Sequence, residues 1–304
     1  MTEIISKCII CESNEFLRDE AATFYLNLAA PLEVRCCIRC DFKWLNPQPS
    51  EAEYKELYQV GYLGANREQQ AQGELLKQYP PKDEQYEEEV IPTRMKWYQS
   101  RLFRLRRIRP KSLALFDIGA GTGDFVALAK EFRWDASGME VSKFACQRAK
   151  EKYRVDLINM DLDQLLTKHG RQYDVVHMSH VLEHISNPKE FLSKVKKLIA
   201  YDGLIVIEVP NQFRSWSDDL VNRKLSRQQI PRSTFSIHHP YFYGKTHLKY
   251  LLESQGYQVL SATTFFLERS LGSTSQIALG IVDFIGNLFG AHGRNIEVIA
   301  TPRG

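Results

Sequence analysis

The chain has 304 residues, of which 43% are hydrophobic, and its formal net charge at pH 7 is only +3. This length and apolar content allow one large core with a small appendage. A charge so close to zero argues against a dedicated nucleic-acid binder. The N-terminus lacks the basic start and apolar run of a signal peptide, and no segment reaches the roughly 20 apolar residues needed to cross a bilayer. We therefore expect a cytoplasmic protein without a membrane span.

Two cysteine pairs near the N-terminus, Cys8 with Cys11 and Cys37 with Cys40, have the C-x2-C spacing. Each such turn aims two thiolates at one ion, and four thiolates suit tetrahedral zinc. Cys36 is an alternative ligand, but the two-residue gap of Cys37 and Cys40 matches the first pair. Reducing conditions in the cytoplasm favour thiols over disulfides. Because four thiolates leave no open position for water or substrate, we expect the zinc to be structural.

Breaks in the sequence divide the chain into three parts. Two prolines within 46–49 end the cysteine-bearing segment, so residues 1–49 are expected to form a zinc-binding module. Residues 50–110 are helix-prone and are expected to form a cap. Within them, 94–109 has an apolar stripe at helical spacing among many basic residues, which indicates an amphipathic helix first and a phosphate or partner site second. Residues 111–304 alternate strands with helices, as in a doubly wound, mostly parallel α/β sheet.

Seven strands are expected in this third part. They lie at 113–118, 136–140, 155–159, 173–179, 203–209, 257–264 and 295–300, with helices at 124–133, 142–153, 188–200 and 245–255. The long connection at 211–239 is expected to be a substrate loop, since long loops at this edge of a sheet are usually functional. An inserted helix at 275–289 has an apolar face that suits core packing first, homodimerisation second and membrane contact last.

A glycine-rich turn, Asp117-Ile-Gly-Ala-Gly-Thr-Gly123, connects the first of these strands to its helix. Nicotinamide dinucleotide proteins use G-x-G-x-x-G, whose last glycine lies inside the helix. Here the spacing is G-x-G-x-G, and Phe125 and Val126 stand where the close-packed glycine should be. This departure favours a methyltransferase over a dinucleotide oxidoreductase.

Four runs of residues, in this order, resemble the class I S-adenosylmethionine-dependent methyltransferases. Within these enzymes they resemble the branch with an N-terminal zinc-binding segment, which includes sugar C-methyltransferases. The runs are Cys37-Ile-Arg-Cys-Asp-Phe-Lys-Trp-Leu-Asn-Pro-Gln-Pro49, the glycine-rich turn, Tyr173-Asp-Val-Val-His-Met-Ser-His-Val-Leu-Glu-His184 and Val209-Pro-Asn211. The resemblance implies a seven-stranded, Rossmann-like sheet, S-adenosylmethionine as cofactor and a small natural-product or sugar-like acceptor.

The resemblance also implies a cofactor site at the carboxyl ends of the strands. Glycines at the turn let the backbone approach the amino-acid end of the cofactor. Glu140, at the end of the second strand, is placed to accept hydrogen bonds from both ribose hydroxyls. The residues implied in cofactor binding are Asp117 (holding the ammonium indirectly), Gly119, Gly121, Gly123, Glu140, Asp161 (adenine amino group), Leu162, Ser179 (backbone) and Tyr62, from a segment that folds over the cofactor.

Histidines follow the strands on the acceptor side. Methyl transfer from a sulfonium is an in-line displacement, and a base is needed when the acceptor must lose a proton. His184 and His239 both fall at the carboxyl-end edge, where open α/β sheets bind their ligands, and we predict them as catalytic base or acceptor-orienting residues. Residues 237–242 match the His-Glu-His run of sugar C-methyltransferases only in part: His239 aligns with the second histidine, but His238 replaces the glutamate and Ile237 the first histidine. Proton removal from carbon is therefore left open.

The acceptor is not identified by these residues. Basic residues outnumber acidic ones in 211–239, which suits an acidic or nucleotide-linked acceptor, although a solvated cationic loop fits equally. Methylation of a carboxyl, amine or lipid group is an alternative. A non-catalytic zinc adaptor that binds RNA or protein is another, but acidic residues outnumber basic ones between residues 8 and 45, which argues against RNA.

Overall fold

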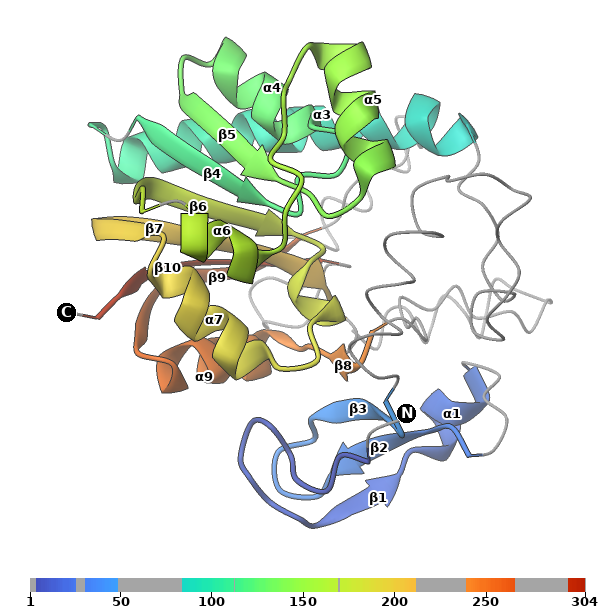
Figure 1. Cartoon of the computed structure of the whole chain (residues 1–304). Helices are drawn as coiled ribbons and strands as arrows, with labels where there is room; N and C mark the ends of the chain where they lie inside the picture. Colours follow the sequence, from blue (N-terminus) through green and yellow to red (C-terminus); the bar gives the residue numbers. More distant parts are fainter. Residues whose placement is uncertain are drawn as a thin grey trace, which may run out of the picture.

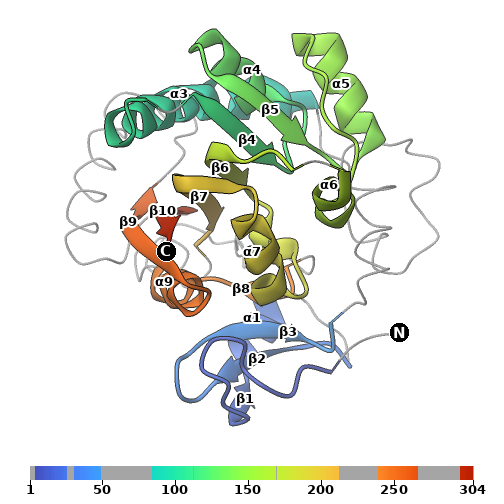
Figure 2. The ribbon, with the colours of Figure 1, turned by 60° about the vertical axis from the view of Figure 1, so that its left-hand side comes forward.

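The computed structural model describes residues 4–25, 31–48, 84–111, 113–168, 170–211, 239–265 and 295–303. These residues form a large sheet with helices on both faces and, beyond one end of it, a small sheet that carries the N-terminus (Figure 1). The view turned by 60° shows the same separation of the two sheets, with β8 between them (Figure 2). No helix in these ranges is long and apolar enough to cross a membrane.

The large sheet has the strand order β5-β4-β6-β7-β10-β9. Its strands are β4 (Ala114–Ile118), β5 (Asp135–Met139), β6 (Tyr173–Ser179), β7 (Ile199–Pro210), β9 (Tyr257–Phe265) and β10 (Asn295–Pro302). The first four are parallel, and β10 pairs antiparallel with both β7 and β9. This is the doubly wound, mostly parallel α/β sheet that the sequence predicts.

One predicted strand, at 155–159, is reduced to a single parallel bridge between Ile158 and Met139, so the described part of the sheet has six strands rather than seven. The side-chain amide of Asn159 donates to the carbonyl oxygens of Glu140 (2.9 Å) and Val141 (3.0 Å). The Asn159 side chain, and not a further strand residue, therefore hydrogen-bonds to these two carbonyl oxygens. Strand pairing between this segment and β5 does not extend beyond the single bridge.

Helices cover both faces of the large sheet. On one face lie α3 (Glu84–Ile108) and α4 (Asp124–Glu131), with α5 (Lys143–Tyr153) beside α4; on the other lie α6 (Leu162–Lys168), α7 (Pro188–Lys196) and α9 (Lys245–Ser254). Helix α3 starts ten residues before the predicted helix at 94–109. Successive residues of a strand point to opposite faces of the sheet. Leu115 belongs to the core under α3 and α4, and Phe116 belongs to the core under α6, α7 and α9.

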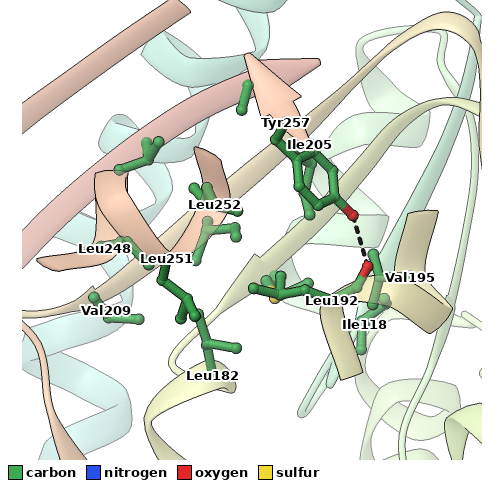
Figure 3. Packing of buried hydrophobic residues seen from close by; sticks show 14 of the residues in the cluster. Ile118, Leu182, Leu192, Val195, Ile205, Val209, Leu248, Leu251, Leu252 and Tyr257 are labelled. Atoms are coloured by element: carbon green, nitrogen blue, oxygen red, sulfur yellow. Dashed lines mark hydrogen bonds between the residues drawn. The ribbon is translucent and has the colours of Figure 1, made fainter. Parts of the chain in front are cut away.

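The core on the α7 and α9 face is built from aliphatic side chains of both helices and of the strands that they cover (Figure 3). Tyr257 is fully buried there and donates its hydroxyl to the carbonyl oxygen of Leu192 at 2.8 Å. Buried Cys8, Phe42 and Trp44 of the small sheet belong to the same apolar cluster. The N-terminal segment is thus packed onto the large domain through a continuous core.

The small sheet is completed by residues far along the chain. Its order is β1-β2-β3-β8, all antiparallel, with β1 (Phe16–Arg18), β2 (Glu33–Cys37), β3 (Lys43–Asn46) and β8 (Tyr241–Phe242); α1 (Glu20–Tyr25) connects β1 and β2. The carbonyl oxygen of Pro240 accepts from Leu45 N and from the Gln48 side chain, both at 3.0 Å. The residue before this junction is His239, so the cysteine-bearing segment is anchored beside it.

Candidate active site

The glycine-rich turn leaves β4 in a left-handed conformation. Gly119, Gly121 and Gly123 have φ of +68°, +54° and +79°, backbone angles that residues with a side chain rarely adopt. A Cβ on Gly119 would lie 2.6 Å from Val181 Cγ2, and one on Gly123 would lie 2.8 Å from Ala149 Cβ. A Cβ on Gly121 would meet no described atom within 4 Å. The backbone at Gly121 is therefore open to close approach by a ligand, while the outer two glycines allow tight packing.

Glu140 follows β5 directly and lies against this turn. Its carboxylate accepts from the backbone N–H groups of Gly121 and Ser142, each at 2.9 Å, and its side chain is buried. Burial raises the pKa of Glu140, against the lowering effect of the two N–H donors and with a further contribution from Asp117. A buried acidic pair therefore flanks the turn, where hydroxyl and cationic groups of a ligand would be stabilised.

Asp161 and Leu162 lie at the start of α6. Asp161 Oδ1 accepts from Gln164 N at 2.9 Å, while Gln164 Oε1 accepts from Asp161 N at 3.2 Å. This reciprocal pair is a capping box, which satisfies the helix N-terminus without any ligand. Leu162 is buried in the core. The contact of these two residues with adenine stays a prediction.

The segment after β6 runs alongside the glycine turn, because Val181 is the residue that packs on Gly119. Ser179, at the end of β6, has a buried hydroxyl for which the described residues offer no hydrogen-bond partner. His180 then adopts a left-handed φ of 57°, and residues 182–184 form a single 3-10 turn. Glu183 and His184 belong to this turn, which lies just beyond the carboxyl end of β6.

His180 is held between two buried carboxylates. Its Nδ1 lies 3.2 Å from Glu183 Oε1, and its Nε2 lies 3.3 Å from Glu208 Oε1. Burial alone would lower the pKa of His180, but Glu183 and Glu208 outweigh it and raise the pKa to about 9. His180 is therefore a cation near neutral pH and is unsuited to accept a proton.

His184 and His239, predicted from the sequence, lie side by side with ring centroids 4.6 Å apart and ring planes at 69°. His239 is buried, and Glu183 is fully buried beside them. One ligand atom from each of Glu183, His184 and His239 lies within 4.8 Å of the others. Such a group can share a proton or bind a divalent cation.

Glu183 was not singled out as a site residue by sequence reasoning. Its Oε1 faces His180 Nδ1 and lies 3.9 Å from His184 Nε2, whereas its Oε2 is buried and has no hydrogen-bond partner among the described residues. The hydroxyl of Tyr243 is also buried without a partner in this part of the chain, and burial, followed by Tyr241 and Glu183, raises its pKa well above the usual value. The sequence does contain a signal that could have identified Glu183: it is an acidic residue between two histidines, His180 and His184, directly after a predicted parallel strand.

The four predicted zinc ligands converge in the small sheet. Cys8 Sγ lies 3.6 Å from Cys40 Sγ and Cys11 Sγ lies 3.4 Å from Cys37 Sγ, and all four sulfurs lie within 4.8 Å of one another. Tetrahedral ligands with zinc–sulfur bonds of about 2.3 Å stand about 3.8 Å apart, whereas a disulfide requires about 2 Å. Cys36 is not part of this group. The donor set therefore fits zinc, with Cys37 in preference to Cys36.

Several predicted features lie outside the described residues. They are Tyr62 and the rest of its segment, the substrate loop except for its two end residues, His238 and the inserted helix at 275–289. The cofactor and acceptor roles predicted for them stay predictions.

Comparison with known proteins gives a consistent family. Residues 88–262, more than half of the chain, match the family model described as a methyltransferase domain. The ubiquinone biosynthesis O-methyltransferase of Salmonella paratyphi A is 27% identical over 145 residues, which are 44% of this chain and 60% of that protein. Its mitochondrial counterpart from Arabidopsis thaliana is 24% identical over 159 residues, 48% of this chain and 49% of that protein. The chain thus spans only about half to three fifths of these relatives.

Solved methyltransferase structures are also similar. One from Archaeoglobus fulgidus is 23% identical, with 67% of this chain and 93% of that chain covered and a TM-score of 0.45. The magnesium protoporphyrin IX methyltransferase of Synechocystis PCC 6803, solved with bound SAH, is 12% identical, with 74% and 90% covered and a TM-score of 0.46.

Proposed function

We propose that this chain, which belongs to the methyltransferase domain family, is an S-adenosylmethionine-dependent methyltransferase whose acceptor is a small natural-product or sugar-like molecule. The observation that carries the proposal is the meeting of two groups of residues at one sheet edge. The glycine turn with Glu140 lies on one side, and Glu183, His184 and His239 lie on the other. The Gly119–Val181 contact joins the two sides.

On the cofactor side, we propose that the backbone of Gly119–Gly123 holds the amino-acid end and that Asp117 attracts its ammonium. Glu140 then accepts from the ribose hydroxyls, Ser179 contributes its backbone, and Asp161 and Leu162 meet the adenine. The carboxylate of Glu140 keeps lone pairs beyond the two N–H groups it already binds, so ribose need not displace them. S-adenosylmethionine, when bound, supplies the electrophilic methyl group.

On the acceptor side, we propose that His239, with His184 against its ring, removes the acceptor proton or orients the acceptor. Imidazole titrates near neutral pH, which suits proton removal from a hydroxyl or amine. The buried carboxylate of Glu183 stabilises the positive charge that an adjacent imidazole gains. The same carboxylate disfavours a carboxyl acceptor, because two anions would meet in a buried site.

Oxygen is the attacking atom that we favour. The curated relatives are named ubiquinone biosynthesis O-methyltransferases, and an imidazole base can take up the proton that a hydroxyl loses during methyl transfer. Carbon methylation, as in sugar C-methyltransferases, is the second candidate, and the partial His-Glu-His match supports it.

We further propose one structural zinc on Cys8, Cys11, Cys37 and Cys40, whose convergence supports it. The three-part division at residues 49 and 110 and the cytoplasmic location are also our proposals. None of the six cysteines, all of which lie in described residues, forms a disulfide, as a reducing compartment would require.

The proposal is tested by a crystal structure with S-adenosylhomocysteine, preceded by calorimetry. We expect the homocysteine end at Gly119–Gly123 and the sulfur facing His239. A closed complex with His239 far from the sulfur would remove it from the acceptor site. Absence of any binding would instead favour the non-catalytic adaptor.

A further inference from the structure

Arg101, in the middle of α3, is fully buried and directs each of its nitrogens to a different partner. Nε donates to Glu297 Oε2 at 2.5 Å, Nη1 lies 2.7 Å from His177 Nε2, and Nη2 donates to Glu208 Oε2. These partners come from β10, β6 and β7. One side chain from the helical segment before the sheet therefore reaches three neighbouring strands.

The contact with His177 determines where the imidazole carries its proton. A guanidinium has only donors, so His177 Nε2 must accept and cannot carry a hydrogen. The remaining ring nitrogen, Nδ1, lies 2.6 Å from Asp117 Oδ1. Nδ1 must therefore carry the proton and donate it in a hydrogen bond to Asp117 Oδ1.

The ring of His177 has little freedom to turn. It is fully buried, and its centroid lies 3.9 Å from that of Phe125 with the planes at 31°. A flipped ring would place carbon atoms against both Arg101 and Asp117, losing two hydrogen bonds between buried polar groups. The two hydrogen bonds of this relay, from Arg101 to His177 and from His177 to Asp117, therefore have one fixed donor direction.

The charges explain why a neutral ring between Arg101 and Asp117 matters. Arg101 and Arg104 are both paired with carboxylates, Glu208 and Glu297. Asp117 receives a hydrogen bond from a neutral imidazole instead of an ion pair. Its orientation is fixed, but its negative charge is not neutralised by Arg101 and can still attract a cation.

We propose that Arg101 and His177 are positioning residues for the cofactor: Arg101 selects the Nδ1–H tautomer of His177, which donates to Asp117 and holds its carboxyl group oriented toward the ammonium of S-adenosylmethionine. This inference rests on the proposed function, because it takes Asp117 to be the group that attracts the ammonium. It goes further in assigning roles to two buried residues outside the glycine turn.

The tautomer is tested on the wild-type protein without any ligand. Long-range proton–nitrogen NMR, with His177 assigned through His177→Phe, should show a protonated Nδ1 and an unprotonated Nε2. A protonated Nε2, in either the neutral or the doubly protonated ring, would overturn the proposal. This readout does not depend on whether the protein binds the cofactor.

The effect on the cofactor is tested by calorimetry with two ligands. His177→Phe keeps an aromatic ring on Phe125 but removes the relay, and we expect it to weaken S-adenosylhomocysteine binding about 10- to 100-fold, as for a lost hydrogen bond to a charged group. Methylthioadenosine lacks the ammonium, so its affinity should stay within about twofold, a difference too small to reflect such a bond. A general packing defect would weaken both ligands.

Two further variants complete the design. His177→Asn retains an amide donor near the position of Nδ1 and should recover part of the lost affinity. Tyr98→Phe alters a ring whose centroid lies 6.2 Å from that of His177 and should bind like the wild type. Equal loss of both ligands in His177→Phe, or wild-type affinity for S-adenosylhomocysteine, would refute the positioning role. Failure of the wild type to bind either ligand would instead refute the proposed function, with the tautomer still measurable.

Discussion

The two sheets of this molecule are stabilised by different means. The central strands β6 and β7 are buried on both faces, with Val175, Val176, Ile205 and Val206 fully inaccessible. In the small sheet, β1 has three residues, and Leu17 is 64% exposed. Strands this short bury too little apolar area to be stable alone. The large sheet therefore follows from its apolar pattern, whereas we infer that the small one depends on packing against the large domain and on cysteine ligands that converge on an ion.

The largest effect is expected from breaking the cysteine cluster. Cys37→Ser should abolish zinc binding and unfold the small sheet, because apparent binding energies for structural zinc are on the order of 10–16 kcal/mol. Elemental analysis of protein purified without chelator measures the metal. Cys36→Ser alters the neighbouring thiol outside the cluster and should retain one zinc per chain. A zinc-free wild type, or full retention in Cys37→Ser, would contradict this assignment.

On the large sheet, the chemistry is expected to depend on His239. His239→Gln should lower turnover about 10²- to 10⁴-fold, the usual contribution of a general base. Affinity for S-adenosylhomocysteine, measured by calorimetry, should stay near that of the wild type, because we propose that His239 contacts the acceptor and not the cofactor. Wild-type turnover in the variant would assign His239 to a structural role at the junction with the small sheet.

A pH-dependent contribution to stability is expected from His180. Its pKa in the folded protein, about 9, lies above the ordinary value of 6.5. Its protonation therefore stabilises the fold fully below about pH 6.5, and this stabilisation is lost as the pH rises through 9. The pKa difference corresponds to at most roughly 3–4 kcal/mol.

Urea unfolding at pH 6.5 and pH 9.5 measures this contribution. His180→Asn suits the test because asparagine tolerates the left-handed backbone at this position. The variant should lose more stability at pH 6.5 than at pH 9.5, relative to the wild type. An equal loss at both values would show that the imidazolium is not the stabilising species.

The smallest effect is expected from Glu140. Glu140→Ala should weaken S-adenosylmethionine binding by roughly 1.5–3 kcal/mol, the range for hydrogen bonds to a charged group. Calorimetry gives the difference, and Glu151→Ala, which removes an exposed carboxylate of α5, is the matched control. Unchanged affinity in Glu140→Ala would place the ribose elsewhere.

The features predicted well from the sequence depend on local patterns. Apolar runs between helices identify the strands, and the glycine spacing marks a turn where each glycine has a positive φ. The spacing of the two C-x2-C pairs also predicts that Cys37, and not Cys36, joins the cysteine cluster, and the positions of the sulfur atoms confirm this. Each of these signals lies within a few residues of its structural consequence.

Features that depend on distant contacts were not predictable. Arg101 stands among other basic residues of an amphipathic helix, and nothing in the sequence marks it as the one that reaches three strands. The two residues of β8 carry no strand periodicity of their own, and they pair only because β3 is adjacent in space. The predicted strand at 155–159 is cut short where the Asn159 side chain hydrogen-bonds to the carbonyl oxygen of Glu140, and the pattern of apolar residues cannot predict such a contact.

The pairing of β3 with β8 also sets an order of events during synthesis. Gln48 and Pro240, which are hydrogen-bonded across this junction, are separated by 192 residues. The N-terminal cysteines therefore leave the ribosome long before the strand that covers β3 has been made. Until then, β3 presents an unpaired edge beside the apolar side chains of Phe42 and Trp44, a template for pairing with another chain. The strands β1 to β3 are therefore translated well before β8, the strand that closes their sheet.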